Sequence, residues 1–170
     1  RLTIQFGTSM CYPISSFGAH VAARPRTSLK TRGNVAMCGT FGYELDPRKL
    51  TDDEKAEAKQ QIVDYRKYHR LVREGDFYRL VSPTENNFYC AWEFVSPDKQ
   101  EAMMTAVVMR QPETRYCVQR LRGLDPKTYY QDEETGTVYS GAMLMNAGLN
   151  LTRDVYEDGT SVTKHFKAVK

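Results

Sequence analysis

The hydrophobic period of the sequence changes at Gly75, and this change limits the possible folds more than any other feature. Before Gly75, Thr51 and Glu54 have the spacing of a capping box and open a helix of about 22 residues. After Gly75, apolar and aromatic residues come in short runs between turn signals, which is typical of strands. The sequence therefore predicts an α/β part followed by an all-β part.

The long helix should bury one face against a larger α/β sheet or barrel. Asp52 and Asp53 lie in its first turn, where the helix dipole favours negative charge, and Gly75 is expected to form a left-handed C-terminal cap. The face that we expect to be buried follows steps of three and four residues: Ala58, Ile62, Tyr65, His69 and Val72.

Shorter elements are expected before the long helix. Helices are predicted over residues 1 to about 11 and over residues 31 to about 38. Residues 17–23 and 39–45 are short runs that suit strands of a parallel sheet covered on both faces. Because the pattern begins at Arg1 without a Met or a cap, we expect the chain to start within a longer protein.

The residues after Gly75 predict an antiparallel β-sandwich. Strands are expected at residues 77–81, 88–95, 102–109 and 116–121, and residues 155–169 could close the sheet as a last hairpin. Turn signals separate these runs at residues 82–87, 96–99, 123–126 and 134–136. We therefore divide the chain into residues 1–74 and residues 75–170.

Charge and composition narrow the classes of partner. The 24 basic and 21 acidic side chains give a net charge of +3 without a block of one sign, so nucleic acid is not expected as a partner. No apolar run approaches the roughly 20 residues that span a bilayer, and no secretory leader is visible, so we expect a soluble, cytoplasmic protein with no membrane partner. The cysteines lie far apart without a metal-binding pattern, which favours reduced, buried thiols over disulfides and predicts no cofactor: Cys11, Cys38, Cys90 and Cys117.

Glu44 and Asp46 are the candidate pair for general acid–base chemistry. Both lie at the end of a predicted parallel strand, where barrel enzymes place their catalytic groups. The interpretation that we favour is structural. Asp46 would cap the turn at Pro47, and Glu44 would make a hydrogen bond or ion pair at the rim of the sheet.

Three histidines are candidate general bases or ligands. His20 lies on a predicted strand, but no nucleophile with a third orienting group can be assigned near it, so we favour a hydrogen-bonded core histidine. His69 is expected on the buried face of the long helix and His165 in the last strand. Neither has a partner at metal-ligand spacing, and we interpret both as structural.

Aromatic and basic side chains offer candidate binding residues. Trp92 and Phe94 share one face of a predicted strand and Tyr89 takes the other, so Trp or Tyr could stack on a sugar ring. Core packing is the favoured interpretation, because aromatics supply much of the buried area of a small β domain. Three arginines flank a short loop and could approach a substrate or a neighbouring subunit, with a solvated loop as the default: Arg24, Arg26 and Arg32.

Several stretches are specific enough to resemble one family. IQFGTSMCYP, SSFGAHV, TRGNVAM and GTFGYELD, at residues 4–13, 15–21, 31–37 and 39–46, look like the α-galactosidases of glycoside hydrolase family 36. The part of these enzymes that follows the catalytic barrel is similar to this chain at residues 75–80, 91–92, 95–96 and 121–125. The resemblance covers nearly the whole chain in the right order.

The resemblance implies that residues 1–74 are the last βα units of a (β/α)8 barrel, joined to a C-terminal antiparallel β-sandwich in residues 75–170. In the family the nucleophilic Asp lies in a K-W-D motif and the acid/base Asp in an S-D-N-T-D motif, and neither motif occurs in this sequence. We therefore carry over no catalytic, substrate-binding or metal-binding residue. The loop between Val21 and Thr31 also looks shorter than the P-N-H-Q-x-G-R loop of the family.

The function implied is that of the C-terminal part of a retaining α-galactosidase acting on raffinose- or melibiose-like oligosaccharides, with this fragment inactive alone. A homo-oligomeric parent is expected, because family members often form tetramers. One alternative is a non-catalytic module whose β part binds sugar or a protein, and another is a small hydrolase that uses Glu44 or Asp46. The incomplete barrel should pack poorly, whereas the β part should survive better.

Overall fold

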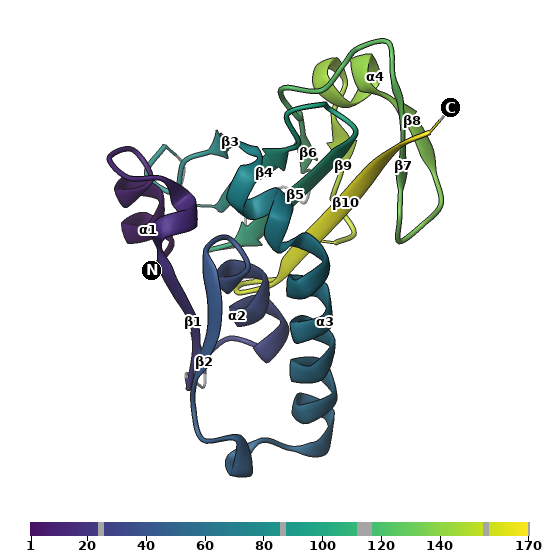
Figure 1. Ribbon diagram of the computed structural model, residues 1–170. Coiled ribbons are helices and arrows are strands. Elements are labelled where there is room, and N and C mark those ends of the chain that lie inside the picture. The colour runs from purple at the N-terminus through teal and green to yellow at the C-terminus, as the bar shows by residue number, and fades with distance from the viewer. Residues whose placement is uncertain (24–25, 86–87, 112–116, 155–156, 170) are drawn as a thin grey trace.

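The computed structural model describes residues 1–23, 26–85, 88–111, 117–154 and 157–169 (Figure 1). Helices and strands alternate up to the long helix: α1 (Leu2–Thr8), β1 (Gly18–Ala22), α2 (Leu29–Ala36), β2 (Thr40–Glu44) and α3 (Asp52–Glu74), with 3-10 turns at Ile14–Ser16 and Pro47–Lys49. Later residues form strands and one short helix, α4 (Gly141–Asn146). The expected order, an α/β part and then an antiparallel β part, is confirmed.

β1 and β2 form a parallel two-stranded sheet in which Gly18 pairs with Thr40. α2 connects the two strands and packs on one face, where Ala19 and Val21 are buried. The opposite face carries His20 and is exposed. The expectation that both faces are covered is therefore wrong for β1, because the described helices lie on one side of this sheet.

Identifiable residues begin and end α3. The predicted capping box is present, since Glu54 N donates to Thr51 Oγ1 at 3.2 Å and Thr51 N donates to Glu54 Oε2 at 3.0 Å. The predicted left-handed cap is wrong, because Gly75 has extended backbone with φ −77° and ψ 155°. A Cβ at Gly75 would lie 2.5 Å from Leu71 O and 3.0 Å from Val95 O. Glycine is needed there for a close approach of two backbones.

The buried face of α3 is rotated from the predicted one. Gln61 and Val72 are buried, whereas Ile62 and His69 are exposed. A glutamine can lie in the helix interface because Gly33 of α2 has no side chain, so the Gln61 amide occupies that space. The spacing of hydrophobic residues does not reveal a polar contact of this kind. The buried face of α3 that was predicted from that spacing is therefore wrong.

Six strands form one antiparallel sheet in the order β3-β4-β5-β10-β7-β8. Their bounds are β3 (Asp76–Val81), β4 (Tyr89–Val95), β5 (Glu101–Val108), β7 (Tyr129–Asp132), β8 (Val138–Ser140) and β10 (Ser161–Val169). A separate two-stranded sheet pairs β6 (Val118–Gln119) with β9 (Leu149–Asn150). Antiparallel pairing is thus confirmed, and the arrangement as a sandwich stays a prediction.

The last strand lies in the middle of the large sheet instead of closing it as a hairpin. β10 pairs with β5 on one side, where His165 faces Met103, and with β7 on the other, where Phe166 faces Asp132. Residues 155–156, at the start of the predicted hairpin, lie outside the described residues. The central position of β10 could not be predicted from the sequence, because its partners β5 and β7 are distant along the chain. Local turn signals carry no information about such pairing.

One hydrophobic cluster joins the two parts of the chain. Phe6, Val35 and Leu71 from the α/β part pack with Trp92 and Phe94 of β4. Another cluster is built within the β part alone and buries a further set of side chains. The boundary between residues 74 and 75 stays a prediction, but the shared cluster covers apolar surface that an isolated α/β part would expose to water.

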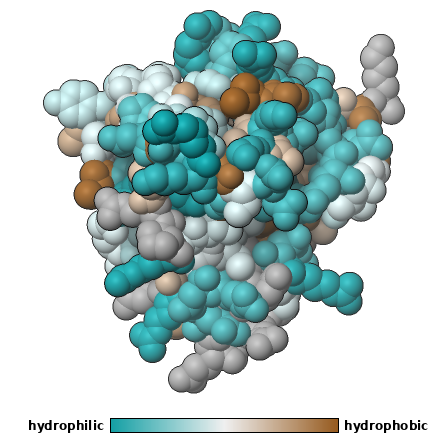
Figure 2. Space-filling model, turned by 90° about the horizontal axis from the view of Figure 1, so that it is seen from below, coloured by the Kyte–Doolittle hydropathy of each residue, from teal (hydrophilic) through white to brown (hydrophobic). Residues whose placement is uncertain are grey.

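Seen from below, the surface is mostly hydrophilic, and its hydrophobic side chains form small, separate groups (Figure 2). The face in this view carries no single broad apolar patch. Large apolar side chains that are exposed on the molecule include Ile4 of α1, at 74%, and Val63 of α3, at 57%. Among the described residues, no helix combines the length and the apolarity that a membrane span requires.

All four cysteines are free thiols. Cys38 and Cys90 are buried as expected, and burial raises the pKa of each to about 12. Cys117 is partly buried, with its pKa raised by the same cause. Cys11 lies beyond the end of α1 and is exposed, so the expectation of burial is wrong for this residue.

Candidate functional site

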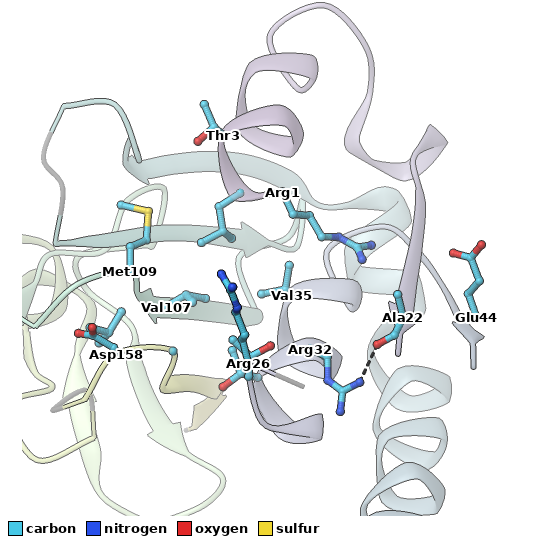
Figure 3. A pocket seen from close by; sticks show the side chains of 15 residues that line it. Arg1, Thr3, Ala22, Arg26, Arg32, Val35, Glu44, Val107, Met109 and Asp158 are labelled. Carbon is cyan, nitrogen blue, oxygen red and sulfur yellow. Dashed lines mark hydrogen bonds between the residues drawn. The ribbon is translucent and has the colours of Figure 1, made fainter. Parts of the chain in front are cut away.

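A cleft of about 830 Å³ lies at the carboxyl ends of β1 and β2, between the start of α1, α2 and the end of β5 (Figure 3). Barrel enzymes bind their substrates at this end of parallel strands, so the cleft is the candidate functional site. Its lining includes three arginines and two carboxylates: Arg1, Arg26, Arg32, Glu44 and Asp158. The apolar side chains of Val35, Val107 and Met109 complete one wall.

Arg32 holds the segments around the cleft together. Its Nη1 donates to Ala22 O at the end of β1 at 2.6 Å, and its Nε donates to Ser28 O at 3.4 Å. Its Nη2 lies 3.9 Å from Glu54 Oε1 at the start of α3, and the side chain is only 15% exposed. Arg32 is therefore a structural clamp, and the expectation of a solvated residue is wrong for it.

The other two loop arginines differ from Arg32. Arg26 is exposed, and its side chain rises into the cleft between Val107 and Val35 (Figure 3). Arg24 lies outside the described residues. Of the predicted basic loop, Arg26 is therefore the residue placed to meet a ligand in the cleft.

The two candidate carboxylates do not meet in the cleft. Asp46 accepts hydrogen bonds from the N and Nε of Arg48 at 3.0 and 2.9 Å, and these bonds hold the pKa of Asp46 below its usual value. The favoured interpretation of Asp46 as the cap of the turn at Pro47 is confirmed. Glu44 is exposed at the margin of the cleft (Figure 3), and the expected hydrogen bond or ion pair is not found among the described residues.

The three histidines have three different environments. His20 is exposed on the open face of β1, so its interpretation as a core residue is wrong. His69 is exposed on α3, with Nδ1 2.9 Å from Arg66 O, and its predicted burial is wrong too. His165 is buried in β10 between Glu101 and Glu133. In the described part of the chain, no group of His, Cys, Asp and Glu side chains is arranged to hold a metal ion.

The aromatic residues of β4 are core residues. Trp92 is 2% exposed and Phe94 is fully buried in the cluster that joins the two parts of the chain. Tyr89 is partly buried and packs against the other cluster. Core packing is therefore confirmed for these side chains, and Trp92 has no exposed face for a sugar ring.

Sequence reasoning missed a buried carboxyl group in β4. Glu93 is fully buried, its Oε2 accepts from Arg122 N at 2.9 Å, and its Oε1 has no hydrogen-bond partner among the described residues. Burial raises the pKa of Glu93 to about 8, although the bond from Arg122 opposes this effect. The signal was present in the sequence, because a single Glu interrupts the apolar run from Ala91 to Val95.

Two family models match consecutive parts of the chain. Melibiase matches residues 1–75, and the glycosyl hydrolase family 36 C-terminal domain matches residues 89–166. Alpha-galactosidase AgaA of Geobacillus stearothermophilus is 50% identical over 158 aligned positions, and the match covers 89% of this chain and 21% of that protein. Alpha-galactosidase 1 of Pediococcus pentosaceus is 41% identical over 176 aligned positions, and the match covers 99% of this chain and 24% of that protein.

Solved structures agree with these matches. The galactosidase domain of AgaSK, a bifunctional protein of Mediterraneibacter gnavus, has a TM-score of 0.92 at 41% identity over 98% of this chain and 24% of that chain. A variant of Geobacillus stearothermophilus AgaA in complex with raffinose has a TM-score of 0.91 at 46% identity over 99% of this chain and 24% of that chain. The chain thus spans 21% to 24% of the length of these relatives.

Proposed function

The chain belongs to glycoside hydrolase family 36, and on that premise we propose that it is the C-terminal part of a retaining α-galactosidase. The parent enzyme would release terminal α-linked galactose from oligosaccharides such as raffinose or melibiose. Both relatives compared above are named α-galactosidases, and one solved relative holds raffinose. These names and that complex support the proposal.

The parallel pair β1–β2 is the observation that carries the proposal. Two parallel strands with helices on one side, an exposed opposite face and, among the described residues, no further strand in their sheet resemble adjacent strands cut from a closed barrel. Under this proposal His20 and Glu44 would face the barrel interior, and α3 would be its last helix. The division into a barrel part, residues 1–74, and a β-sandwich, residues 75–170, belongs to the same proposal.

This chain alone should not hydrolyse galactosides. A retaining glycosidase needs two carboxyl groups about 5 to 5.5 Å apart, one as nucleophile and one as acid and base. Of the candidate pair, only Glu44 lines the cleft, and Asp46 is occupied by Arg48. We therefore assign catalysis to the parts of the parent that carry the K-W-D and S-D-N-T-D motifs, and no catalytic residue to this chain.

The loop after β1 would alter the parent's substrate site or its subunit contacts. The alignment with the Pediococcus pentosaceus relative runs over 176 positions, more than the 170 residues of this chain, so that relative carries extra residues opposite it. The shortened segment between Val21 and Thr31 is the proposed place of this difference. A homo-oligomeric parent and a cytoplasmic location stay predictions beside it.

Reading the gene in frame upstream of Arg1 tests the proposal directly. Codons for K-W-D and S-D-N-T-D in that order would support it, and the complete gene product should then cleave a chromogenic α-galactoside while residues 1–170 should not. An upstream frame that codes for an unrelated domain would refute it. Full activity in residues 1–170, lost on Asp46→Asn, would instead favour a small independent hydrolase.

A further inference from the structure

His165 of β10 is buried between two carboxylates that come from different elements. Its Nε2 lies 2.5 Å from Glu101 Oε1 on β5, and its Nδ1 lies 2.6 Å from Glu133 Oε2 in the turn after β7. The His165 side chain is only 5% exposed. Both ring nitrogens are therefore committed to carboxylate oxygens at hydrogen-bonding distance.

The number of N–H donors that these two contacts require determines the protonation state of the His165 ring. An ionised carboxylate only accepts hydrogen bonds, and a neutral imidazole has a single N–H. Burial alone would raise the pKa of Glu133, but hydrogen bonds, first among them those from Lys167 and Lys67, lower it to about 2, so this carboxylate is ionised. Because a carboxylate accepts and does not donate, both contacts are hydrogen bonds only when His165 carries a proton on each nitrogen.

The same group is where α3 meets the sheet. The Tyr68 ring of α3 packs against the imidazole, with ring centroids 4.4 Å apart and ring planes tilted by 46°, and Lys67 of α3 donates to Glu133. An aromatic face attracts a cation, so Tyr68 also favours the charged ring. The contact between the long helix and the β part therefore depends on charges as well as on packing.

We propose that His165, Glu101, Glu133 and Tyr68 form a charge-dependent fastener between α3 and the large sheet. In its closed form the His165 imidazolium donates to both carboxylates beside the Tyr68 ring. Loss of one proton leaves a carboxylate facing a ring lone pair, and the repulsion loosens the contact with α3. This inference concerns the chain itself and holds whether or not the parent is an α-galactosidase.

Water can reach the fastener through a neighbouring cleft. A cleft of about 390 Å³ between α2, α3 and β10 is lined in part by His165, Glu133 and Tyr68. The ring can therefore exchange protons with solvent without unfolding of the chain. Other charged groups surround it: Lys67 and Arg70 on α3, Lys164 and Lys167 on β10, and Glu134 beside Lys164.

Nitrogen-15 NMR of histidine-labelled residues 1–170 tests the protonation state of the His165 ring directly. A histidine of ordinary pKa, about 6.5, is mostly neutral at pH 8. We expect one histidine at pH 8 to show protonated signals at both nitrogens, and we expect His165→Gln to remove that signal. A neutral tautomer for His165 at pH 8 overturns the proposal.

A double-mutant cycle between Glu101→Gln and His165→Gln tests whether the charges fasten α3. Because charge-assisted hydrogen bonds are among the strong ones, the coupling at pH 7 should be roughly tenfold to a hundredfold in the unfolding equilibrium constant. Amides of α3 should also exchange hydrogen faster in Glu101→Gln at the same pH. His69→Gln, an exposed change on the same helix, is the matched control and should leave that exchange unchanged. No coupling, or equal exchange in both variants, contradicts the fastener.

Discussion

The side-chain amide of Gln61 occupies the space that Gly33 leaves by having no Cβ. Gln61 is 2% exposed, and its Nε2 donates to Leu29 O at 3.0 Å. The hydroxyl of Tyr43 donates to Gln61 Oε1 at 2.9 Å. One polar side chain thus ties α3 to α2 and to β2, and its place depends on the absence of a methyl group.

We expect Gly33→Ala to destabilise the chain by roughly 1–3 kcal/mol in urea unfolding, because the new methyl group overlaps Gln61 and disturbs its buried hydrogen bonds. Alanine alone would favour the helix, so the sign of the change tests the contact. Gly7→Ala in α1 is the matched control, since a Cβ at Gly7 meets nothing within 4 Å. Equal behaviour of the two variants would show that the Gln61 contact does not limit stability.

Local signals predicted the elements well, and long-range contacts account for the errors. The capping box at Thr51 and the strand runs at 77–81, 88–95 and 102–109 depend on neighbouring residues alone, and these are confirmed. The run predicted at 116–121 forms only the two-residue β6, and its first residue lies outside the described part of the chain. The face of α3 was misplaced because Gln61 fits a gap in another helix. Central placement of β10 was missed because its pairing with β5 and β7 joins distant parts of the sequence.

The candidate site could be predicted only in part, for a related reason. Parallel strands followed by polar residues indicated the edge of the sheet at which the cleft lies. The sequence showed that three arginines flank the loop after β1, but it did not show what each one contacts. The role of Arg32 as a clamp depends on Ala22, Ser28 and Glu54, which approach one another only in the fold. Exposure of His20 is equally non-local, because it depends on which sides of the sheet other elements cover.

Glu93→Gln should stabilise the chain at neutral and higher pH. The pKa of Glu93 is about 8 in the folded chain, above its ordinary value of 4.5, so folding keeps a proton that the unfolded chain loses. The favourable contribution is complete below pH 4.5 and is lost as pH rises toward 8. A glutamine keeps an acceptor for Arg122 N without the proton, and the expected gain at pH 7 is roughly 1–3 kcal/mol.

Urea unfolding of both proteins between pH 4.5 and 9 checks this expectation for Glu93. The difference in stability should be small at the acid end, grow with pH and level off above pH 8. Glu157→Gln, a change at an exposed carboxyl group, should show no such trend. A pH-independent difference for Glu93→Gln would mean that this carboxyl group is not protonated in the folded chain.

The cysteine thiols should differ in how fast a disulfide reagent modifies them. Thiolate is the reactive form, and Cys11 is exposed, whereas burial raises the pKa of Cys38 and Cys90 to about 12. A chromogenic disulfide reagent at pH 8 should therefore modify Cys11 quickly and the two buried thiols only as the chain opens. Cys11→Ser should remove the fast phase. Rapid reaction of Cys38 or Cys90 in the folded chain would contradict the burial of these two thiols.

Fluorescence of Trp92 should not respond to galactosides. Trp92 is the single tryptophan, it is 2% exposed, and it packs with Phe94 in the cluster between the two parts of the chain. Its emission should be that of a buried indole and should remain unchanged on titration with raffinose, melibiose or galactose. Sucrose, which lacks galactose, serves as the control for refractive and viscosity effects. Saturable quenching by galactosides alone would restore the hypothesis of a sugar-binding β module, because a buried tryptophan changes its emission only when a bound ligand alters its surroundings.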